Sequence, residues 1–419
     1  MALHADVRPR SVEWFTATSG LESVADSMSR SLLPIVAVSS LGAGAAVVGV
    51  INSLGLLAFL LLSVPVGVLA DRWSAPRRMM TASTLLRASL TMAAFAAAAA
   101  GWIHGDVGLI LLIGLTLIIG IADVIYTTGM GLLVPRLAEP AEIRAVFGRV
   151  QSATQAGGAA GSAILAGLLA VVTAPIAWIA PAALYVSSAL TQQRVHESTP
   201  PPPAPHRVAM WTQARAGVHQ LFAHPVLARI TLANMANNTA VMAANALLPV
   251  IALSQLGIAP GEYAAIGACG AVAGIAAATA ASGITARLGL RTTRLMTAGL
   301  IVLGTLAVML SGAYVDLLPG PAILWLGLQA VLAGAGTSIA MVAGSDLPAR
   351  VVPSTDLGTV MGAQRALTMG VMPLAALGFG VLGSLLGIGA VTWAWLAAAV
   401  AAGLPCVGLR TETEQAAHP

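Results

Sequence analysis

Four ionisable residues stand inside long hydrophobic stretches of this sequence. Glu22, Asp26 and Arg30 follow one another at intervals of four, and Asp123 lies in a later stretch. A charge in such a position is costly when the segment is buried in lipid, so each needs a reason. Burial favours the neutral form of a carboxylate, while a nearby arginine favours the charged form, so these acids could take up and release a proton. We expect Asp26 to do so first, and Glu22 or Asp123 next.

The same spacing permits a purely structural explanation. Residues four apart are neighbours on a helix, so Asp26 and Arg30 could form a permanent pair that only makes their burial tolerable. Arg87, early in another hydrophobic stretch, could in the same way neutralise Asp123. The polar stripe of the first stretch must face other helices or a water-filled cavity rather than lipid. It also includes Ser19, Ser23 and Ser27.

The composition places these residues in a membrane protein. Of the 419 residues, 58% are hydrophobic and only 9% are charged, which is far from the balance of a soluble domain. A helix needs about 20 mostly apolar residues to cross a bilayer, and runs of that length recur along the chain. We predict twelve spans, at 14–38, 45–69, 79–101, 108–134, 148–171, 174–192, 228–253, 262–286, 293–314, 321–345, 358–384 and 388–409.

Arginines alternate from one break between spans to the next. They occur at the N-terminus and in every second break, whereas the breaks around Gly42, Gly105, Thr173, Pro260, Asp316 and Gly387 contain none. By the positive-inside rule the arginine-containing breaks face the cytoplasm. Both termini are then cytoplasmic and the number of spans is even. We expect a multi-pass protein of the inner (cytoplasmic) membrane whose first span is retained, without a cleavable signal.

The chain also repeats itself. LLPIVAVSSLG from Leu32 to Gly42 matches LLPVIALSQLG from Leu247 to Gly257 at seven of eleven positions, with an offset of 215 residues. Duplicated halves in an apolar chain are typical of membrane transporters. We therefore expect three parts, which are an N-terminal six-helix bundle (1–192), a cytoplasmic linker (193–227) and a C-terminal six-helix bundle with a short tail (228–419).

The expected linker has two features. The stretch STPPPPAP from Ser198 to Pro205 must be extended and semi-rigid. The residues that follow predict an amphipathic helix on the inner membrane surface, although this segment could instead be the start of the seventh span. Its apolar face would contain Trp211, Ala214, Val218, Leu221 and Phe222.

At the end of the second span the sequence GVLADRWSAPRR resembles the loop signature of the major facilitator superfamily. The residues at its key positions are Gly67, Asp71, Arg72, Arg77 and Arg78. In the second half, GITARLGLRTTR keeps Gly283, Ala286 and Arg294 but has Arg287 in place of the acid. The resemblance implies the major facilitator fold, which is an all-α polytopic membrane protein with 12 transmembrane helices in two pseudo-symmetric six-helix bundles. Asp71 could accept hydrogen bonds from backbone amides at a helix N-terminus or pair with an arginine, so this loop could act as a gate that favours the state closed on the cytoplasmic side. The alternative is that these arginines only set the topology.

Two further features resemble the bacterial exporter branch of that superfamily. Asp26 shares the first span with the pair Leu33 and Pro34. The fifth span resembles the glycine-rich motif of drug and proton antiporters, although Ser162 stands where that motif has proline. Close helix packing is the other explanation for its glycines, which are Gly148, Gly157 and Gly161.

The resemblance further implies that spans 1, 4, 7 and 10 line a central cavity. Where the first span is charged, the seventh carries asparagines. The candidate substrate contacts are Asn234, Asn237, Asn238, Asn245, Tyr126, Gln151, Gln155, Gln329 and Trp325.

The sequence excludes most other classes of protein. It contains no nucleotide-binding loop, nucleophile motif or zinc spacing, so we expect neither an enzyme nor a cofactor or metal. Cys269 and Cys406 lie in apolar runs and should not form a disulfide. We expect a monomer that exchanges protons for a small, moderately hydrophobic molecule and exports it, without nucleic acid. A proton symporter that imports a metabolite, or a transporter-like sensor without flux, are the alternatives.

Overall fold

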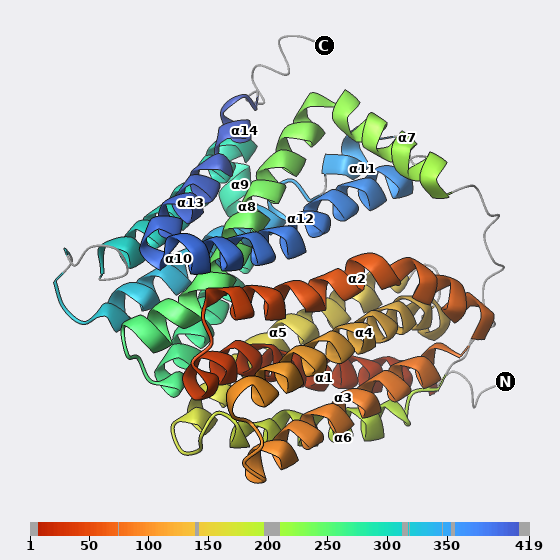
Figure 1. Ribbon diagram of the computed structural model, residues 1–419. Helices are drawn as coiled ribbons and strands as arrows, with labels where there is room; N and C mark the ends of the chain where they lie inside the picture. The colour runs from red at the N-terminus through yellow and green to blue at the C-terminus, as the bar shows by residue number, and fades with distance from the viewer. Residues whose placement is uncertain are drawn as a thin grey trace. The chain divides into compact units, whose positions relative to one another are not determined.

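The computed structural model describes residues 7–73, 75–138, 142–196, 210–311, 317, 319–345, 347–352 and 357–409. Within these ranges the chain is built of helices, as the hydrophobic pattern predicts (Figure 1). The helices belong to two compact units. Unit 1 comprises Met1–Ala43, Leu54–Pro205 and Ala259–Ala268, and unit 2 comprises Gly44–Ser53, His206–Ile258 and Cys269–Pro419. The proline-rich stretch from Ser198 to Pro205 lies outside the described residues, and the predicted limits of the linker stay a prediction.

Unit 1 contains most of the first six helical segments. Their bounds are α1 (Val7–Leu41), α2 (Ala45–Trp73), α3 (Pro76–Ala99), α4 (Gly105–Leu137), α5 (Ile143–Leu169) and α6 (Ile179–Gln192). A 3₁₀ turn at Ile176–Trp178 leads directly into α6. α3 begins at Pro76 because proline has no amide hydrogen and so loses nothing at the first position of a helix.

Unit 2 contains most of the remaining helices. Their bounds are α7 (Met210–Ala223), α8 (Pro225–Pro249), α9 (Pro260–Leu310), α10 (Ala322–Val342), α11 (Leu347–Val351), α12 (Leu357–Leu386), α13 (Ile388–Ala401) and α14 (Leu404–Val407). A π-helical turn at Val250–Gln255 extends α8. α9 is broken at Gly289, whose φ of 74° and ψ of 161° are not helical and are open to glycine at little cost.

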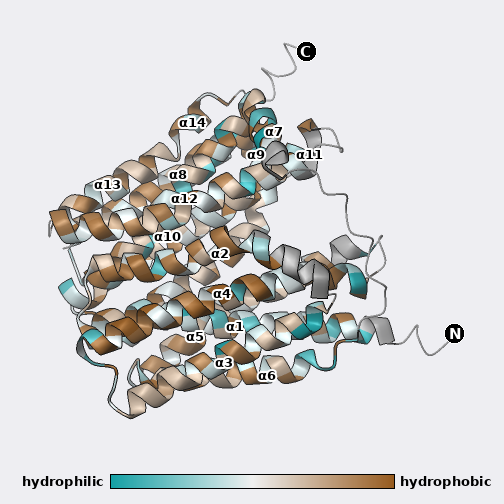
Figure 2. Ribbon diagram, turned by 45° about the vertical axis from the view of Figure 1, so that its right-hand side comes forward, coloured by the Kyte–Doolittle hydropathy of each residue, from teal (hydrophilic) through white to brown (hydrophobic). Residues whose placement is uncertain are grey.

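Eight of the described helices are long and apolar enough to cross a membrane, and hydrophobic residues recur along these helices in Figure 2. α9 supplies two of the predicted spans because Gly289 divides it. α1, α5 and α6 fall outside the eight; α1 carries ionisable residues, and α6 has only 14 residues. When α9 is counted as two segments and α1, α5 and α6 are added, the described helices match the twelve spans that the sequence predicts. The all-α polytopic fold is therefore confirmed.

The serines of α1 face α5, whereas its acids face elsewhere. Ser23 Oγ donates a hydrogen bond to the backbone oxygen of Thr154 at 2.6 Å, and Ser27 Oγ donates to that of Gly158 at 2.8 Å. Successive residues of a helix are about 100° apart, so serines and acids that are neighbours in sequence diverge. The polar stripe expected as a single surface is therefore two adjoining faces, one toward α5 and one toward α3, α4 and α6.

Two glycines allow the close approach of α1 and α5. A Cβ at Gly161 would lie 2.5 Å from the backbone oxygen of Val24, and one at Gly157 would collide with that of Gly20. Only hydrogen fits in these two places. A Cβ at Gly148, in contrast, would meet no described atom within 4 Å.

The amphipathic helix α7 packs on α12. Leu221 is fully buried against Leu227 and Val360. A Cβ at Gly217 would lie 2.5 Å from the backbone oxygen of Thr359, so the two helices touch along their backbones. α7 is a helix separate from α8, and its buried face serves packing within unit 2.

Candidate functional site

Arg87 of α3 lies at the centre of a buried cluster of charges in unit 1. Its side chain is 0% exposed and pairs with three carboxylates. Nη1 donates to Asp26 Oδ1 at 2.7 Å and to Asp123 Oδ1 at 2.8 Å, and Nη2 donates to Glu22 Oε1. One guanidinium therefore joins α1, α3 and α4. We call these four residues together with Arg30 the charge cluster.

Glu22 is the most enclosed acid of the charge cluster, with 2% of its surface exposed. Besides Arg87, it accepts a hydrogen bond from Thr84 Oγ1 at 3.0 Å and one from Ser188 Oγ at 2.5 Å. Thr84 and Arg87 are three residues apart and so share a face of α3. Both oxygens of Glu22 are thus held by donors.

Asp26 is held on one side only. Arg87 and the hydroxyl of Tyr185, which donates at 2.5 Å, both bind its Oδ1. Within the described residues no hydrogen bond reaches Oδ2, and 23% of the side chain is exposed. Asp26 is the acid of the charge cluster with a free oxygen.

Asp123 of α4 lies between two cations. Arg30 Nη2 donates to its Oδ2 at 2.7 Å, while Arg87 holds Oδ1. The side chain of Arg30 is 61% exposed and that of Asp123 is 16% exposed. The charge cluster therefore runs from enclosed Glu22 to exposed Arg30.

Two tyrosines enclose the guanidinium of Arg87. Its central carbon lies 4.8 Å from the ring centre of Tyr126 and 5.0 Å from that of Tyr185. The negative face of an aromatic ring attracts a cation, more strongly where water is excluded. Tyr126 is buried at 6% exposure, so it supports Arg87.

The charges of the cluster do not balance. Glu22, Asp26 and Asp123 carry three negative charges when ionised, and Arg30 and Arg87 carry two positive ones. An uncompensated charge is costly in a membrane interior. Such a set of residues can bind one proton, because a carboxylate can be protonated whereas arginine keeps its charge.

The sequence named all five members of the charge cluster but not its pattern of pairing. Arg30 pairs with Asp123 rather than with Asp26, its neighbour four residues away. Arg87 does neutralise Asp123, as one alternative held, and it binds Glu22 and Asp26 as well. The partners that the sequence did not indicate are Thr84, Tyr185 and Ser188.

The expected gating loop is described in part. Gly67, Asp71 and Arg72 lie in the last turns of α2, and their side chains lie outside the described residues. Arg77 donates to the backbone oxygens of Gln193 and Val195, at 3.2 Å each, just beyond the C-terminus of α6. A cation satisfies carbonyls that have no helical partner there. Arg78 is exposed and borders the same open pocket as Arg77.

The candidate substrate contacts of unit 2 are in different surroundings. Asn234 Oδ1 accepts from Arg294 at 2.8 Å, and Asn238 Nδ2 donates to the backbone oxygen of Thr368 at 2.8 Å. Asn237 is 9% exposed and lines a small cavity with Arg294. Two asparagines of α8, Asn234 and Asn238, thus form hydrogen bonds to α9 and α12.

The remaining candidates include exposed and buried residues. Asn245, Gln151 and Gln155 are exposed, whereas Gln329 is 5% exposed. Trp325 Nε1 donates to the backbone oxygen of Pro319 at 3.1 Å. Within the described ranges no cluster of His, Cys, Asp and Glu side chains is arranged to hold a metal ion.

Solved structures share this fold. The chain has a TM-score of 0.73 and 14% identity to a mutant form of the nucleoside transporter NupG, covering 95% of this chain and 98% of that one. A bacterial homolog of the human lysosomal transporter Spinster, in an inward-facing and occupied conformation, gives a TM-score of 0.65 at 13% identity, with 96% and 94% covered. No curated protein matches the sequence.

The family model of the Major Facilitator Superfamily matches residues 16–376. That range contains the charge cluster and α8, as well as the loop signature on which the resemblance rested. Members of this family are transporters and not enzymes. The chain therefore belongs to the major facilitator superfamily, and it is a polytopic secondary transporter that works by alternating access.

Proposed function

We propose that this protein is a proton-coupled exporter of small, moderately hydrophobic molecules. The observation that carries the proposal is the unbalanced charge cluster in unit 1, in which three carboxylates share two arginines. When the cluster is closed off from water, a proton removes the surplus charge. When it is open to water, solvation stabilises the charge and the proton leaves.

Asp26 is the carrier of this proton. Glu22 is held by donors at both oxygens, and Asp123 is held by a cation at each oxygen. Asp26 has one oxygen without a described partner and a partly exposed side chain. Protonation at Oδ2 would leave the bonds of Oδ1 to Arg87 and Tyr185 in place, so it disturbs the charge cluster least.

Export is supported by two features of the first span and by the nature of the candidate contacts. Asp26 and Pro34 lie together in α1, as the resemblance to the exporter branch requires. The exposed candidates Gln151, Gln155 and Asn245 are neutral amides. Neutral donors and acceptors suit a cargo with little charge, and they disfavour a strongly anionic one such as a sugar phosphate.

Everted membrane vesicles test the coupling. Vesicles carrying the wild-type protein are acidified inside, and a panel of lipophilic dyes and antibiotics is added one at a time while the internal pH is followed. A transported compound should release protons from these vesicles. Asp26→Asn should abolish this release, because an amide of the same shape cannot take up the proton.

Asp106→Asn is the matched control. Asp106 is exposed in the first turn of α4, away from the charge cluster, so this variant should behave as wild type. Proton release that survives Asp26→Asn would contradict the role of Asp26. Proton-driven accumulation of a compound inside intact cells would show import, and the absence of flux for every compound bound in a thermal-shift screen would favour a sensor.

A further inference from the structure

The internal repeat relates the charge cluster of unit 1 to a second polar site in unit 2. With the offset of 215 residues, Glu22 of α1 corresponds to Asn237 of α8. Both side chains are buried, at 2% and 9% exposure. Each lies near a buried arginine, Arg87 on α3 and Arg294 on α9. Glu22 and Asn237 thus match in repeat position and burial but differ in charge, whereas the two arginines beside them occupy different positions of the repeat.

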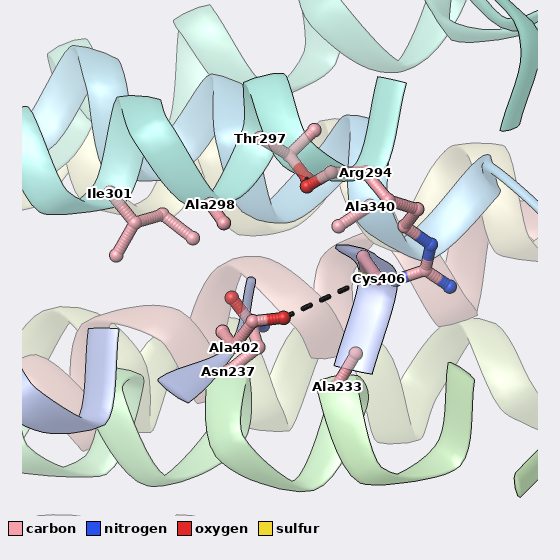
Figure 3. A pocket seen from close by; sticks show the side chains of 9 residues that line it. All are labelled: Ala233, Asn237, Arg294, Thr297, Ala298, Ile301, Ala340, Ala402 and Cys406. Atoms are coloured by element: carbon pink, nitrogen blue, oxygen red, sulfur yellow. Dashed lines mark hydrogen bonds between the residues drawn. The ribbon is translucent and has the colours of Figure 1, made fainter. Parts of the chain in front are cut away.

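The site in unit 2 is a small cavity (Figure 3). Its volume is about 10 Å³, which is room for about one water-sized particle. The side chains come from α8, α9, α10 and the segment α13–α14. The residues that line it are Ala233, Asn237, Arg294, Thr297, Ala298, Ile301, Ala340, Ala402 and Cys406.

Two residues that line the cavity each have a buried polar atom without a partner among the described residues. Arg294 is 4% exposed, and its Nε has no hydrogen-bond partner among the described residues. The same holds for Oδ1 of Asn237. A buried polar atom without a partner destabilises the folded state. The cavity is therefore suited to an occupant that binds at these atoms.

The charge of Arg294 is the stronger constraint. Its described side-chain partner is the amide oxygen of Asn234, at 2.8 Å. No carboxylate in the described part of the chain pairs with it. A guanidinium does not lose its proton, so burial leaves a fixed positive charge that only an anion can balance. In unit 1 the carboxylate of Glu22 provides that balance for Arg87.

We propose that this cavity is a binding site for a single halide ion, chloride under ordinary conditions. The ion lies beside Asn237, the repeat counterpart of Glu22, with Arg294 Nε as one donor. Asn237 supplies a second donor after a half-turn of its amide, which exchanges the oxygen and the nitrogen. Chloride is somewhat larger than water, and the flexible side chain of Arg294 can shift to admit it. This site goes beyond the proton coupling proposed above and does not depend on it.

Thermal unfolding of the purified protein tests the proposal. The midpoint is measured at fixed pH and ionic strength while sodium chloride replaces sodium gluconate, whose anion is too large for the cavity. A ligand that binds only the folded state raises the midpoint with concentration. We expect a rise of about 3 °C or more, which bromide should reproduce. An equal midpoint in chloride and gluconate would show that water alone fills the site.

Three variants locate the effect. Arg294→Gln should remove the dependence on chloride, because the fixed charge is gone. Asn237→Asp keeps the shape of asparagine and brings in a carboxylate, so it should be as stable in gluconate as in chloride. Arg291→Gln is the control, since it removes a partly exposed charge from the same helix and should retain the full rise. Chloride dependence that persists in Arg294→Gln would overturn the assignment.

A measurement on the wild-type protein covers the case in which Arg294→Gln does not fold. Crystals grown in bromide should show an anomalous scattering peak within hydrogen-bonding distance of the Arg294 side chain. The proposal is wrong if bromide is bound elsewhere in the crystal and this cavity shows no anomalous peak.

Discussion

The two halves of this transporter place a buried arginine beside the same position of the repeat, but they balance its charge differently. In unit 1, Glu22 is one of three carboxylates around Arg87. In unit 2, Asn234 gives Arg294 a neutral oxygen, and Asn237 lines a cavity. The first site has negative charge in excess and the second has positive charge in excess. A duplicated scaffold can therefore keep its packing while its two halves are suited to ligands of opposite sign.

The largest difference between the two sites is expected when Arg87 is replaced. Arg87→Ala leaves three acids without their shared partner, and removal of one member of a buried ion pair costs about 3–5 kcal/mol. We expect the largest loss of unfolding free energy in the molecule, measured by denaturant titration in detergent. Arg78→Gln removes an exposed arginine from the same helix and serves as the control. Equal stability of both variants would show that the charge cluster is not a structural centre.

The corresponding change in unit 2 should cost less. Asn234→Ala removes the hydrogen bond to Arg294, and a hydrogen bond to a charged group contributes about 1.5–3 kcal/mol. The titration belongs in gluconate, so that no halide compensates for the lost acceptor. A loss as large as that of Arg87→Ala would mean that the two sites contribute equally to the unfolding free energy.

Ser188→Ala tests how much the hydrogen bond from α6 to Glu22 contributes to stability. The variant removes the donor 2.5 Å from Oε2 but leaves Arg87 and Thr84 on Oε1. We expect a loss of about 1.5 kcal/mol in the same titration, the lower end of the range for a hydrogen bond to a charged group, because Oε1 of Glu22 keeps its donors. Ser187→Ala is the control, because Ser187 is exposed and bonds to its own helix. If both serine variants match wild type, the contact between α6 and Glu22 contributes nothing to stability.

Arg30→Gln should have the smallest effect on stability. Its side chain is 61% exposed whereas that of Asp123 is 16% exposed, so the pair lies between the exposed pairs that contribute about 0–1 kcal/mol and fully buried ones. Asp123 also keeps its bond to Arg87 in this variant. We expect a nearly unchanged midpoint of unfolding together with altered proton release from vesicles, because the surplus of carboxylates rises. A midpoint lowered as far as that of Ser188→Ala would show that the exposed end of the charge cluster is also structural.

The sequence revealed the spans and the charged residues because both stand out against an apolar background. Glu22, Asp26, Asp123 and Arg87 were visible as charges inside hydrophobic runs. The division of α9 was also expected, since the break containing Gly289 separates two predicted spans.

The pairing could not be read from the sequence, because it depends on the rotation of helices about their axes. Tyr185 lies 159 residues from Asp26, and neither tyrosine nor serine is conspicuous in a membrane helix. Local spacing favoured a pair of Asp26 and Arg30, but Arg30 reaches across to α4 instead. The sequence indicated Arg294 only as part of the second copy of the loop signature, at the very start of a predicted span. Its burial could not be predicted, because it depends on α8 and α14.

The close contact between α1 and α5 limits how the proposed proton site can move. Serine hydroxyls bind carbonyls across it, and at Gly157 and Gly161 the backbones leave no room for a side chain. Neither helix can slide past the other without breaking these bonds, so α1 and α5 should move together as a rigid pair. A displacement of Asp26 would then move Gln151 and Gln155 on α5 as well, so the proposed protonation would shift the surface that is proposed to contact the cargo.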